Sequence, residues 1–447
     1  MTTARVLVIG AGLAGSDAAW FLASRGVSVV LAEVKTLKKN PAQKIPHFAE
    51  LVCTNSLKSL DPDSAHGLLK TEMRAMGSLI LSVASETAVP AGDALAVDRE
   101  LFSKAITEKL STHPNIRVVA VEASDPLALM REFECQHVIV ASGPLTTGPL
   151  EQWMVDNLGA EDIYFYDAIA PVVDADTLDY DKLYYKDRHR KPDERADYLN
   201  APMNKEQYDA FIAAMVAAEK VPPKDFEDWK FFESCLPIDL MAERGPETAR
   251  FSCMKPIGLE LPDGSEPWAV VQLRKENLAG AAFNLVGFQT RLTYKEQVRI
   301  FRMIPGLEEA SFIHLGSCHR NSFLNSRRLL NASMTSLKYP ELSFAGQITG
   351  VEGYTESAAM GLYVAGQLWK RLNNQAELVW PKETAIGALV NYVMTIEKPT
   401  PSNINFGLLP SVELTKEQRK MGPRKKVRKS FAAARAREVF EVFRDQL

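Results

Sequence analysis

Cysteine is scarce in this chain, and its few copies stand apart from one another. The 447 residues contain five, and none of them forms a Cys-x-x-Cys pair. They are Cys53, Cys135, Cys235, Cys253 and Cys318. Zinc sites and disulfide frameworks both need cysteines at close and regular spacing, so neither is indicated. We therefore expect no bound metal and a protein whose thiols stay reduced, which suits the cytoplasm.

Long apolar stretches are also missing. No uninterrupted apolar run approaches the ~18 residues that a membrane span requires. The apolar N-terminal stretch lacks the cleavage-site pattern of a secretory signal, so we interpret it as part of a folded unit. No internal repeat is visible. We expect a protein without a membrane partner.

Charge is nearly balanced over the whole chain but not locally. The formal net charge is -4, yet residues 416–437 contain ten Lys or Arg and a single acid. This local excess of +9 leaves -13 for the remainder. Such a segment is either a solvated C-terminal helix or a face that contacts the phosphates of a polyanion, and the sequence leaves both interpretations open.

A complete dinucleotide-binding pattern occupies residues 5–33, where a strand, a glycine turn, a helix, a second strand and an acid follow in order. Gly10 permits the tight turn, Gly12 lets backbone amides approach a pyrophosphate, and Gly15 lets the helix pack close to the strand. The start of the helix then favours an anion. The predicted cofactor-binding residues of this turn are Gly10, Ala11, Gly12, Leu13, Ala14 and Gly15.

Glu33 closes this pattern, 18 residues past Gly15 at the end of the second strand. A carboxylate at that place accepts hydrogen bonds from a ribose hydroxyl and repels a 2′-phosphate. The pattern therefore predicts an unphosphorylated adenosine ribose, as in FAD or NAD.

A second glycine-rich turn occurs late in the chain, where a strand over residues 342–345 leads into residues 346–361 and then a helix. This order is typical of the second cofactor contact of an FAD protein, in which a helix start faces the flavin. The alternative is a turn that serves packing alone. The turn contributes Gly346, Gln347, Gly350, Gly353 and Tyr354, and an earlier strand that ends in Ala-Ser-Gly contributes Gly143. Two separated contacts favour FAD over NAD.

The middle of the chain has a different character, with helical runs such as 205–219, strands such as 268–273 and 283–288, and several prolines. The length also exceeds what one core usually supports. We therefore predict an α/β fold with two domains. A Rossmann-like FAD-binding domain of the two-dinucleotide-fold type spans residues 1–148 and 335–447. An inserted α+β domain at 149–334 takes the substrate or RNA.

Two of the cysteines have distinctive neighbours. Cys53 is followed by Thr54, Asn55 and Ser56, which would be odd around a purely structural thiol, and Cys235 precedes Leu-Pro. A free cysteine is usually a small buried hydrophobe, so composition alone assigns reactivity to neither. The polar neighbours of Cys53 predict a loop there.

Several blocks of sequence closely resemble one enzyme family, the folate- and FAD-dependent tRNA (uracil-5-)-methyltransferases. The blocks are Gly-Ala-Gly-Leu-Ala-Gly at 10–15, Phe-Ala-Glu-Leu-Val-Cys-Thr-Asn-Ser-Leu at 48–57, Phe-Phe-Glu-Ser-Cys-Leu-Pro at 231–237, Met-Lys-Pro-Ile-Gly at 254–258, Val-Gly-Phe-Gln-Thr at 286–290 and Phe-Ala-Gly-Gln-Ile-Thr-Gly-Val-Glu-Gly-Tyr at 344–354. The resemblance runs from Val6 to about Leu408. Ser234 and Cys253 depart from the family pattern, but neither departure removes a thiol that the reaction uses.

The resemblance implies that reduced FAD carries a methylene group from 5,10-methylenetetrahydrofolate to C5 of a uridine in RNA, with NAD(P)H as reductant. It implies that Cys235 is the covalent nucleophile, that Cys53 assists later steps such as proton removal, and that Asn55 contacts the cofactor. It further implies that folate or RNA is bound by Lys255, Arg274, Gln289, His319, Arg320 and Asn321. The expected target is the T-loop uridine of tRNA, which must be extruded from its stack.

Three other functions remain open at this point. The same chemistry could act on a uridine of 23S rRNA, as it does in close homologues. The chain could instead be a small-molecule FAD-dependent reductase, for which the thiols and the basic tail would be incidental. It could also bind RNA without catalysis. The basic tail favours an RNA partner, and the presence of both thiols favours catalysis.

Overall fold

A five-stranded parallel sheet lies at the centre of the larger of two units. The computed structural model describes residues 4–447 except 41, 147, 160–162, 169, 189–195, 223–230, 232–235, 278, 317 and 398–399. The strands lie in the order β16 (Leu342–Phe344), β7 (His137–Val140), β1 (Arg5–Ile9), β2 (Ser28–Glu33) and β6 (Ile116–Ala120). All four pairings are parallel. Their apolar runs are buried because helices cover both faces of the sheet. The predicted α/β class is confirmed.

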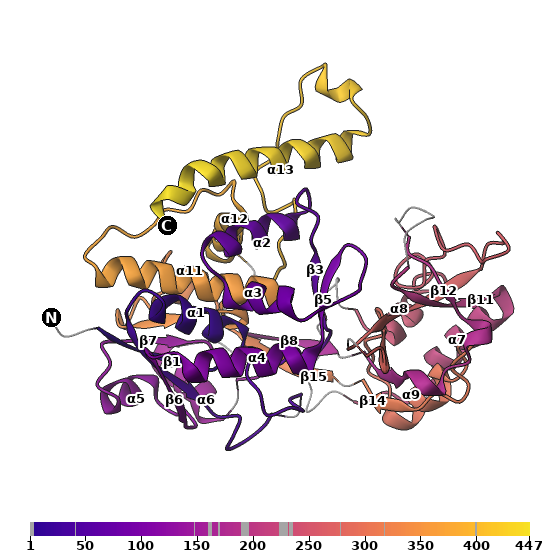
Figure 1. Ribbon diagram of the computed structural model, residues 1–447, viewed down its shortest axis with the longest axis horizontal. Helices are drawn as coiled ribbons and strands as arrows, with labels where there is room; N and C mark the ends of the chain where they lie inside the picture. Colours follow the sequence, from indigo (N-terminus) through magenta and orange to yellow (C-terminus); the bar gives the residue numbers. More distant parts are fainter. Residues whose placement is uncertain are drawn as a thin grey trace.

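Two helices cover one face of this sheet in close contact, α1 (Leu13–Ala23) and α11 (Tyr354–Leu372) (Figure 1). Their approach depends on glycine, because a Cβ built on Gly361 would lie 2.1 Å from the carbonyl oxygen of Ala14. The other helices of this unit are α2 (Ala65–Ala75), α3 (Leu79–Glu86), α4 (Arg99–Thr112), α5 (Pro126–Glu132), α6 (Pro149–Leu158), α10 (Ser326–Leu329), α12 (Ala385–Thr395) and α13 (Arg424–Phe443). A small sheet of β3 (Ser56–Ser59), β5 (Ala94–Val97) and β4 (Ala88–Val89) lies beside them.

Helices α2 and α3 are separate, because Gly77 takes a left-handed φ of 82° and Ser78 caps the second helix. One local expectation differs from the structure. The late helix begins at Tyr354, directly after Gly353, so much of the second glycine-rich segment is already helical.

The smaller unit is built on a six-stranded sheet in the order β10 (Tyr184–Tyr185), β11 (Leu199–Met203), β12 (Ala269–Lys275), β13 (Ala282–Leu285), β9 (Val172–Asp174) and β14 (Phe312–His314). Every pairing is antiparallel. Helices α7 (Lys205–Ala217), α8 (Ile238–Arg244) and α9 (Tyr294–Phe301) belong to the same unit. Short 3-10 helices occur at Ala175–Thr177, Tyr180–Lys182, Gln347–Thr349, Gln418–Lys420 and Arg444–Gln446.

A two-stranded ribbon connects the two units, formed by antiparallel pairing of β8 (Ile163–Ala168) with β15 (Cys318–Phe323). Each unit has its own hydrophobic core. The core of the larger unit includes Leu150 and Met154 before the ribbon and Leu324, Leu330 and Met334 after it. Both ends of the segment expected in the insertion therefore pack with the first domain, and we propose that the insertion itself spans about 170–316. Among the described residues, no helix has the length and apolarity that a bilayer crossing demands.

Candidate active site

The first glycine turn forms a cradle at the end of β1. Gly10 has a φ of 99°, and a Cβ there would lie 2.5 Å from the carbonyl oxygen of Ala141. A Cβ on Gly15 would lie 1.8 Å from the oxygen of Gly10, whereas one on Gly12 would meet no atom within 4 Å. Gly12 is also the N-cap of α1 and provides no side-chain hydrogen bond. Gly10 and Gly15 thus serve the packing of the turn, and Gly12 leaves the helix start open to an anion.

Glu33 lies at the end of β2 and fastens this turn. One carboxylate oxygen accepts a hydrogen bond of 2.6 Å from the amide of Ala11, and the other accepts one of 2.8 Å from the amide of Lys35. A carboxylate offers about four lone-pair sites, so acceptor capacity remains for a ribose hydroxyl. Glu33 lines the cavity described below.

The second glycine turn lies close to the first. Gly346 has a φ of 85°, and a Cβ on it would lie 2.7 Å from that of Ala14 on α1. The side chain of Gln347 donates a 2.5 Å hydrogen bond to Glu352, and Gly353 forms the uncapped start of α11. The two turns that the sequence places more than 300 residues apart therefore meet around the start of α1.

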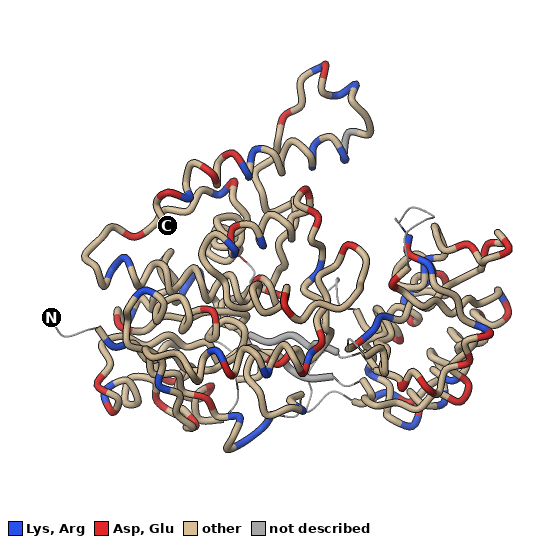
Figure 2. The backbone as a smooth tube through the Cα atoms, in the orientation of Figure 1, with Lys and Arg blue, Asp and Glu red and all other residues tan. Residues whose placement is uncertain are grey.

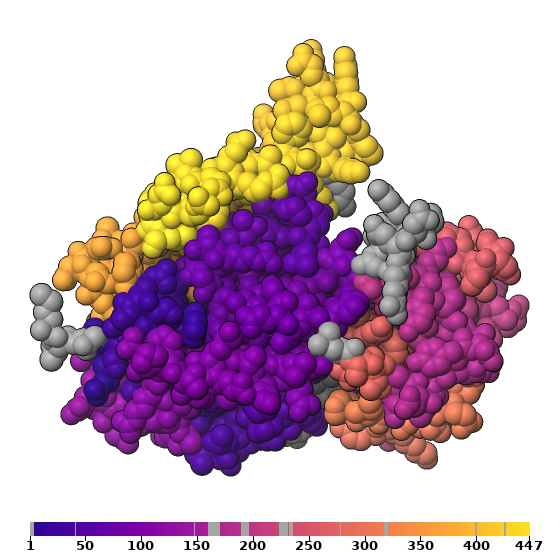
Figure 3. All heavy atoms as spheres, viewed as in Figure 1, coloured from indigo at the N-terminus to yellow at the C-terminus, as the bar shows by residue number. Residues whose placement is uncertain are grey.

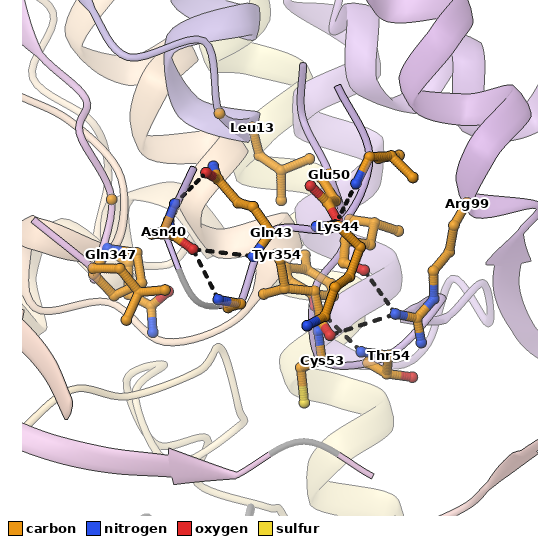
Figure 4. A pocket seen from close by; sticks show the side chains of 18 of the residues that line it. Leu13, Asn40, Gln43, Lys44, Glu50, Cys53, Thr54, Arg99, Gln347 and Tyr354 are labelled. Carbon is orange, nitrogen blue, oxygen red and sulfur yellow. Dashed lines mark hydrogen bonds between the residues drawn. The ribbon is translucent and has the colours of Figure 1, made fainter. Parts of the chain in front are cut away.

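A cavity of about 1950 Å³ joins both turns to the inserted unit (Figure 4). The predicted site residues that line it are Gly10, Gly12, Leu13, Ala14, Glu33, Cys53, Gly143, Gly346, Gln347, Gly353, Tyr354, Arg274, Gln289 and Asn321. Ala11, Gly15, Asn55, Gly350 and the exposed Lys255 do not line it. Cys235 lies outside the described residues, as do the side chains of His319 and Arg320, whose backbone belongs to β15.

Cys53 lies on a loop that side chains from several elements hold. The hydroxyl of Tyr354, at the start of α11, accepts hydrogen bonds from the amides of Cys53 at 2.6 Å and Thr54 at 3.3 Å. Burial raises the pKa of Tyr354 above its ordinary value, so the phenol stays protonated. Figure 4 shows the Cys53 sulfur pointing away from Arg99, into the open space of the cavity.

Arg99 supports the same loop from α4, donating to the carbonyl oxygen of Leu51 at 2.8 Å. Its guanidinium pairs with Glu276 of the inserted unit at 2.7 Å. Burial acts to lower the pKa of Arg99, but the charge of Glu276, with smaller contributions from Tyr354 and Cys53, raises it. A permanent cation therefore lies within electrostatic reach of the Cys53 thiol. No pattern in the sequence indicates that Arg99 pairs with Glu276.

Asn55 and Arg274 link the Cys53 loop to the inserted unit. The Asn55 amide donates to Val97 and Lys275 carbonyl oxygens at 3.1 and 2.9 Å, and its oxygen accepts from Arg274 at 2.9 Å. Asn55 is fully buried, and both of its amide hydrogens are engaged by protein. It therefore connects the Cys53 loop to β12 of the inserted unit and does not face the cavity. Arg274 also bonds Thr54 at 2.5 Å, so its side chain holds this loop while lining the cavity.

The residues that follow Cys235 are fixed to the wall of the cavity. The amide of Ile238 donates to the carbonyl oxygen of Gln289 at 2.7 Å. Asp239 is fully buried and pairs with Arg291 at 2.5 Å, and it accepts a hydrogen bond from Thr290 at 2.9 Å. Gln289, Thr290 and Arg291 all line the cavity.

A buried carboxylate lies just inside the start of α11. Glu356 is fully buried, 4.0 Å from the ammonium of Lys58 and 3.4 Å from the ring of His66. Burial acts to raise the pKa of Glu356, but Lys58 and His66 lower it to about 2. Lys58 itself lines the cavity and has a left-handed φ of 64°. Sequence reasoning missed this cluster because its members are far apart in the chain.

The donor set of the cavity fits a dinucleotide and a second polar ring. The glycines of the first turn have no side chains and so leave room for a ligand. No side chain caps the start of α1. Asn284 and Asn321 are each 2% exposed and line the cavity, and among the described residues each has one side-chain amide atom without a hydrogen-bond partner. Unpaired buried amides are costly, so they indicate a missing polar partner. The described residues contain no group of three or more His, Cys, Asp and Glu side chains suited to a metal.

Two glycine turns on one parallel sheet, with a carboxylate after the second strand and a cavity shared with an inserted unit, define a flavoprotein of the dinucleotide-binding class. A family model described as "Glucose inhibited division protein A" matches residues 5–376. The chain belongs to this family and, within it, to the methylenetetrahydrofolate--tRNA-(uracil-5-)-methyltransferases.

The relatives that carry this second name match nearly the whole chain. The TrmFO protein of Enterococcus faecalis is 49% identical over 92% of this chain and 93% of its own length. That of Bdellovibrio bacteriovorus is 48% identical over 98% of this chain and 97% of its own. Among solved structures, Aquifex aeolicus GidA aligns with a TM-score of 0.65 at 15% identity, covering 99% of this chain and 74% of that one. This last similarity concerns the fold.

Proposed function

We propose that this chain is a flavin-dependent RNA methyltransferase that forms 5-methyluridine in tRNA with 5,10-methylenetetrahydrofolate as carbon donor. The observation that carries the proposal is one cavity lined by both glycine turns, the Cys53 loop and the wall at 289–291, to which Ile238 is bonded. The family membership supplies the reaction class. A small-molecule reductase would need neither the thiol loop nor the inserted wall.

The reaction explains why thiols are required. Uracil C5 is a poor nucleophile, and a thiolate that adds to C6 turns C5 into an enolate carbon able to attack an electrophilic one-carbon unit. Cys235 forms the bond to C6. Cys53 takes the proton from C5, and the sulfur–C6 bond then breaks to restore the ring. The Arg99 guanidinium holds the Cys53 loop in place through the carbonyl oxygen of Leu51.

The chain's own residues position the reactants. The open start of α1 at Gly12 binds a pyrophosphate, and Glu33 receives the adenosine ribose of FAD. The unpaired amides of Asn284 and Asn321 face the polar edge of a uracil or pterin ring. When bound, FAD reduced by NAD(P)H supplies the one-carbon unit from folate and the reducing equivalent that completes the methyl group.

The RNA target is a transfer RNA, as in the names of the relatives. Those names favour tRNA as the substrate. No feature of the described residues indicates 23S rRNA. Extrusion of a stacked uridine costs a few kcal/mol, which contacts to the RNA backbone must offset. We also propose a cytoplasmic location, because free folate and unmodified tRNA meet there.

A labelling assay tests this function. Purified protein is incubated with labelled 5,10-methylenetetrahydrofolate, NAD(P)H and either unmodified tRNA or unmodified ribosomal RNA. We expect label on the tRNA, loss of labelling to background in Cys235→Ala, and near-normal labelling in the control Cys253→Ala. Cys253 does not line the cavity, and burial raises the pKa of its thiol to about 12, so it is chemically inert. Label on neither RNA, or full turnover by Cys235→Ala, would overturn the proposal.

A further inference from the structure

The excess of positive charge on α13 lies at its N-terminal end (Figure 2). Basic side chains gather at its N-terminal half and in the segment just before it, which we call the basic arm, residues 416–429. The exposed members that the structure describes are Lys416, Arg419, Lys420, Lys426, Arg428 and Lys429. The C-terminal half of the helix carries two cations and two acids, Arg435, Arg437, Glu438 and Glu441, and has no net charge. The arm is thus a concentrated positive surface at one end of one helix.

This arrangement opposes the stability of the helix itself. The N-terminus of a helix has the positive end of its dipole, which favours acids there and bases at the C-terminus. Here Arg424, Lys425 and Lys426 occupy the first turn, and the first turn has no acid. Like charges three positions apart on a helix are also neighbours, so Lys426 and Lys429 repel. Helix formation therefore does not explain why basic residues lie here. An anion that binds from outside removes the repulsion among them.

The C-terminal half of α13 is fixed firmly to the FAD-binding unit. Phe440 and Phe443 are buried against the ring of Trp380, with centroids 6.4 and 4.7 Å away. Arg437 pairs with Asp63 at 2.5 Å. The basic arm lies beyond this anchor, and in Figure 3 it stands out from the surface of the larger unit. Charge is thereby held at a defined place on a rigid support.

We propose that the basic arm docks the phosphate backbone of the substrate RNA, outside the cavity where the base reacts. The inference rests on the proposed function, since it takes the RNA to be the methylated substrate. Each phosphate that a Lys or Arg neutralises releases condensed counterions, which provides sequence-independent affinity. Arg435 and Arg437 lie outside residues 416–429 and bond Pro410 and Asp63 within the protein, so they are not part of this surface. Arg419 uses one N–H on the carbonyl oxygen of Leu414 and keeps its others for a phosphate.

RNA fits the arm better than an anionic membrane does. Helices that bind a membrane surface expose a continuous apolar face beside their cations. In the described part of the arm, Met421 is the one strongly exposed large apolar side chain, and Val427 is buried. The apolar face of α13 is used in packing, so the arm offers charge without the surface that would enter a bilayer.

The test compares two triple variants of the full-length holoenzyme. Lys426→Gln/Arg428→Gln/Lys429→Gln removes three charges of the arm, and Arg131→Gln/Lys295→Gln/Lys382→Gln removes three exposed charges elsewhere. Dissociation constants for unmodified tRNA are measured from about 50 to 200 mM salt. Loss of three phosphate contacts lowers the slope of log affinity against log salt by about 2 to 3. The salt-induced fall in affinity then becomes about fifteenfold to sixtyfold smaller than in wild type.

We expect that change in the arm variant and no change in the control variant. A second arm variant, Lys416→Gln/Arg419→Gln/Lys420→Gln, is expected to flatten the slope without touching the helix. Equal slopes in wild type and both arm variants, while wild type methylates tRNA, would overturn the inference and leave the proposed function intact. Absence of methylation by wild type would instead overturn the proposed function. Arm-dependent binding to phosphatidylglycerol vesicles, with an unchanged tRNA slope, would assign the arm to membranes and also overturn the inference.

Discussion

Alanine substitutions at Gly12 and Gly15 should separate the folding of the first turn from its binding of a nucleotide. A Cβ on Gly15 would lie 1.8 Å from the oxygen of Gly10, about half of a normal contact distance. The helix must therefore shift, and overpacking of this kind costs about 1–3 kcal/mol. Gly12 has a φ of -73° and open space around its Cβ. Alanine fits there and raises stability by up to about 1 kcal/mol, because the unfolded chain loses freedom.

Urea unfolding of the flavin-free proteins and titration with FAD measure the two effects. We expect Gly15→Ala to lower the free energy of unfolding by about 1–3 kcal/mol. Gly12→Ala should keep or slightly raise it, while its dissociation constant for FAD rises about tenfold or more, a loss of about 1.4 kcal/mol of binding energy. Unchanged FAD affinity in Gly12→Ala would show that the helix start does not meet the pyrophosphate. A fully stable Gly15→Ala protein would refute the close-packing argument.

Two further predictions concern buried carboxylates. Asp239→Asn leaves the buried guanidinium of Arg291 facing an amide nitrogen, so urea unfolding should show a loss of about 3 kcal/mol. Glu296→Gln removes a surface pair with the half-exposed Arg299 and should change the free energy of unfolding far less, and similar losses in both variants would contradict this. Burial raises the pKa of Asp17 to about 7, so the folded state keeps a proton that the unfolded chain releases near pH 4. The free energy of unfolding should then fall by about 2 kcal/mol between pH 5 and 7. Asp17→Asn should abolish this fall. Parallel pH profiles of stability for wild type and Asp17→Asn would contradict the prediction.

The parts of the site that the sequence predicted are those set by local geometry. Gly10, Gly12, Gly15 and Glu33 belong to one strand–helix–strand unit, so their spacing alone constrains where they lie. The second turn at Gly346 could be recognised for the same reason. The start of α11 was misplaced because the sequence does not reveal that Gly353 already ends the turn.

The parts that could not be predicted depend on contacts between distant segments. Arg99 meets Glu276, and Asn55 meets Arg274, across separations of 177 and 219 residues. Nothing in the neighbourhood of Asn55 distinguishes an amide that binds a cofactor from one that bridges two domains. An asparagine in either role is polar, precedes a strand and lies next to the Cys53 loop. Only the folded structure therefore shows which contacts Asn55 makes.

The ribbon of β8 and β15 gives the inserted domain an unusual independence. The chain leaves the first domain and returns to it on adjacent strands, and Ala168 is directly paired with Cys318. Joining two ends that already touch costs little loop-closure entropy. The backbone of the insertion can therefore be replaced without opening the parallel sheet, provided that the replacement keeps partners for Arg99 and Asn55. A replacement of this kind would retain the nucleotide cradle and change the wall that faces it.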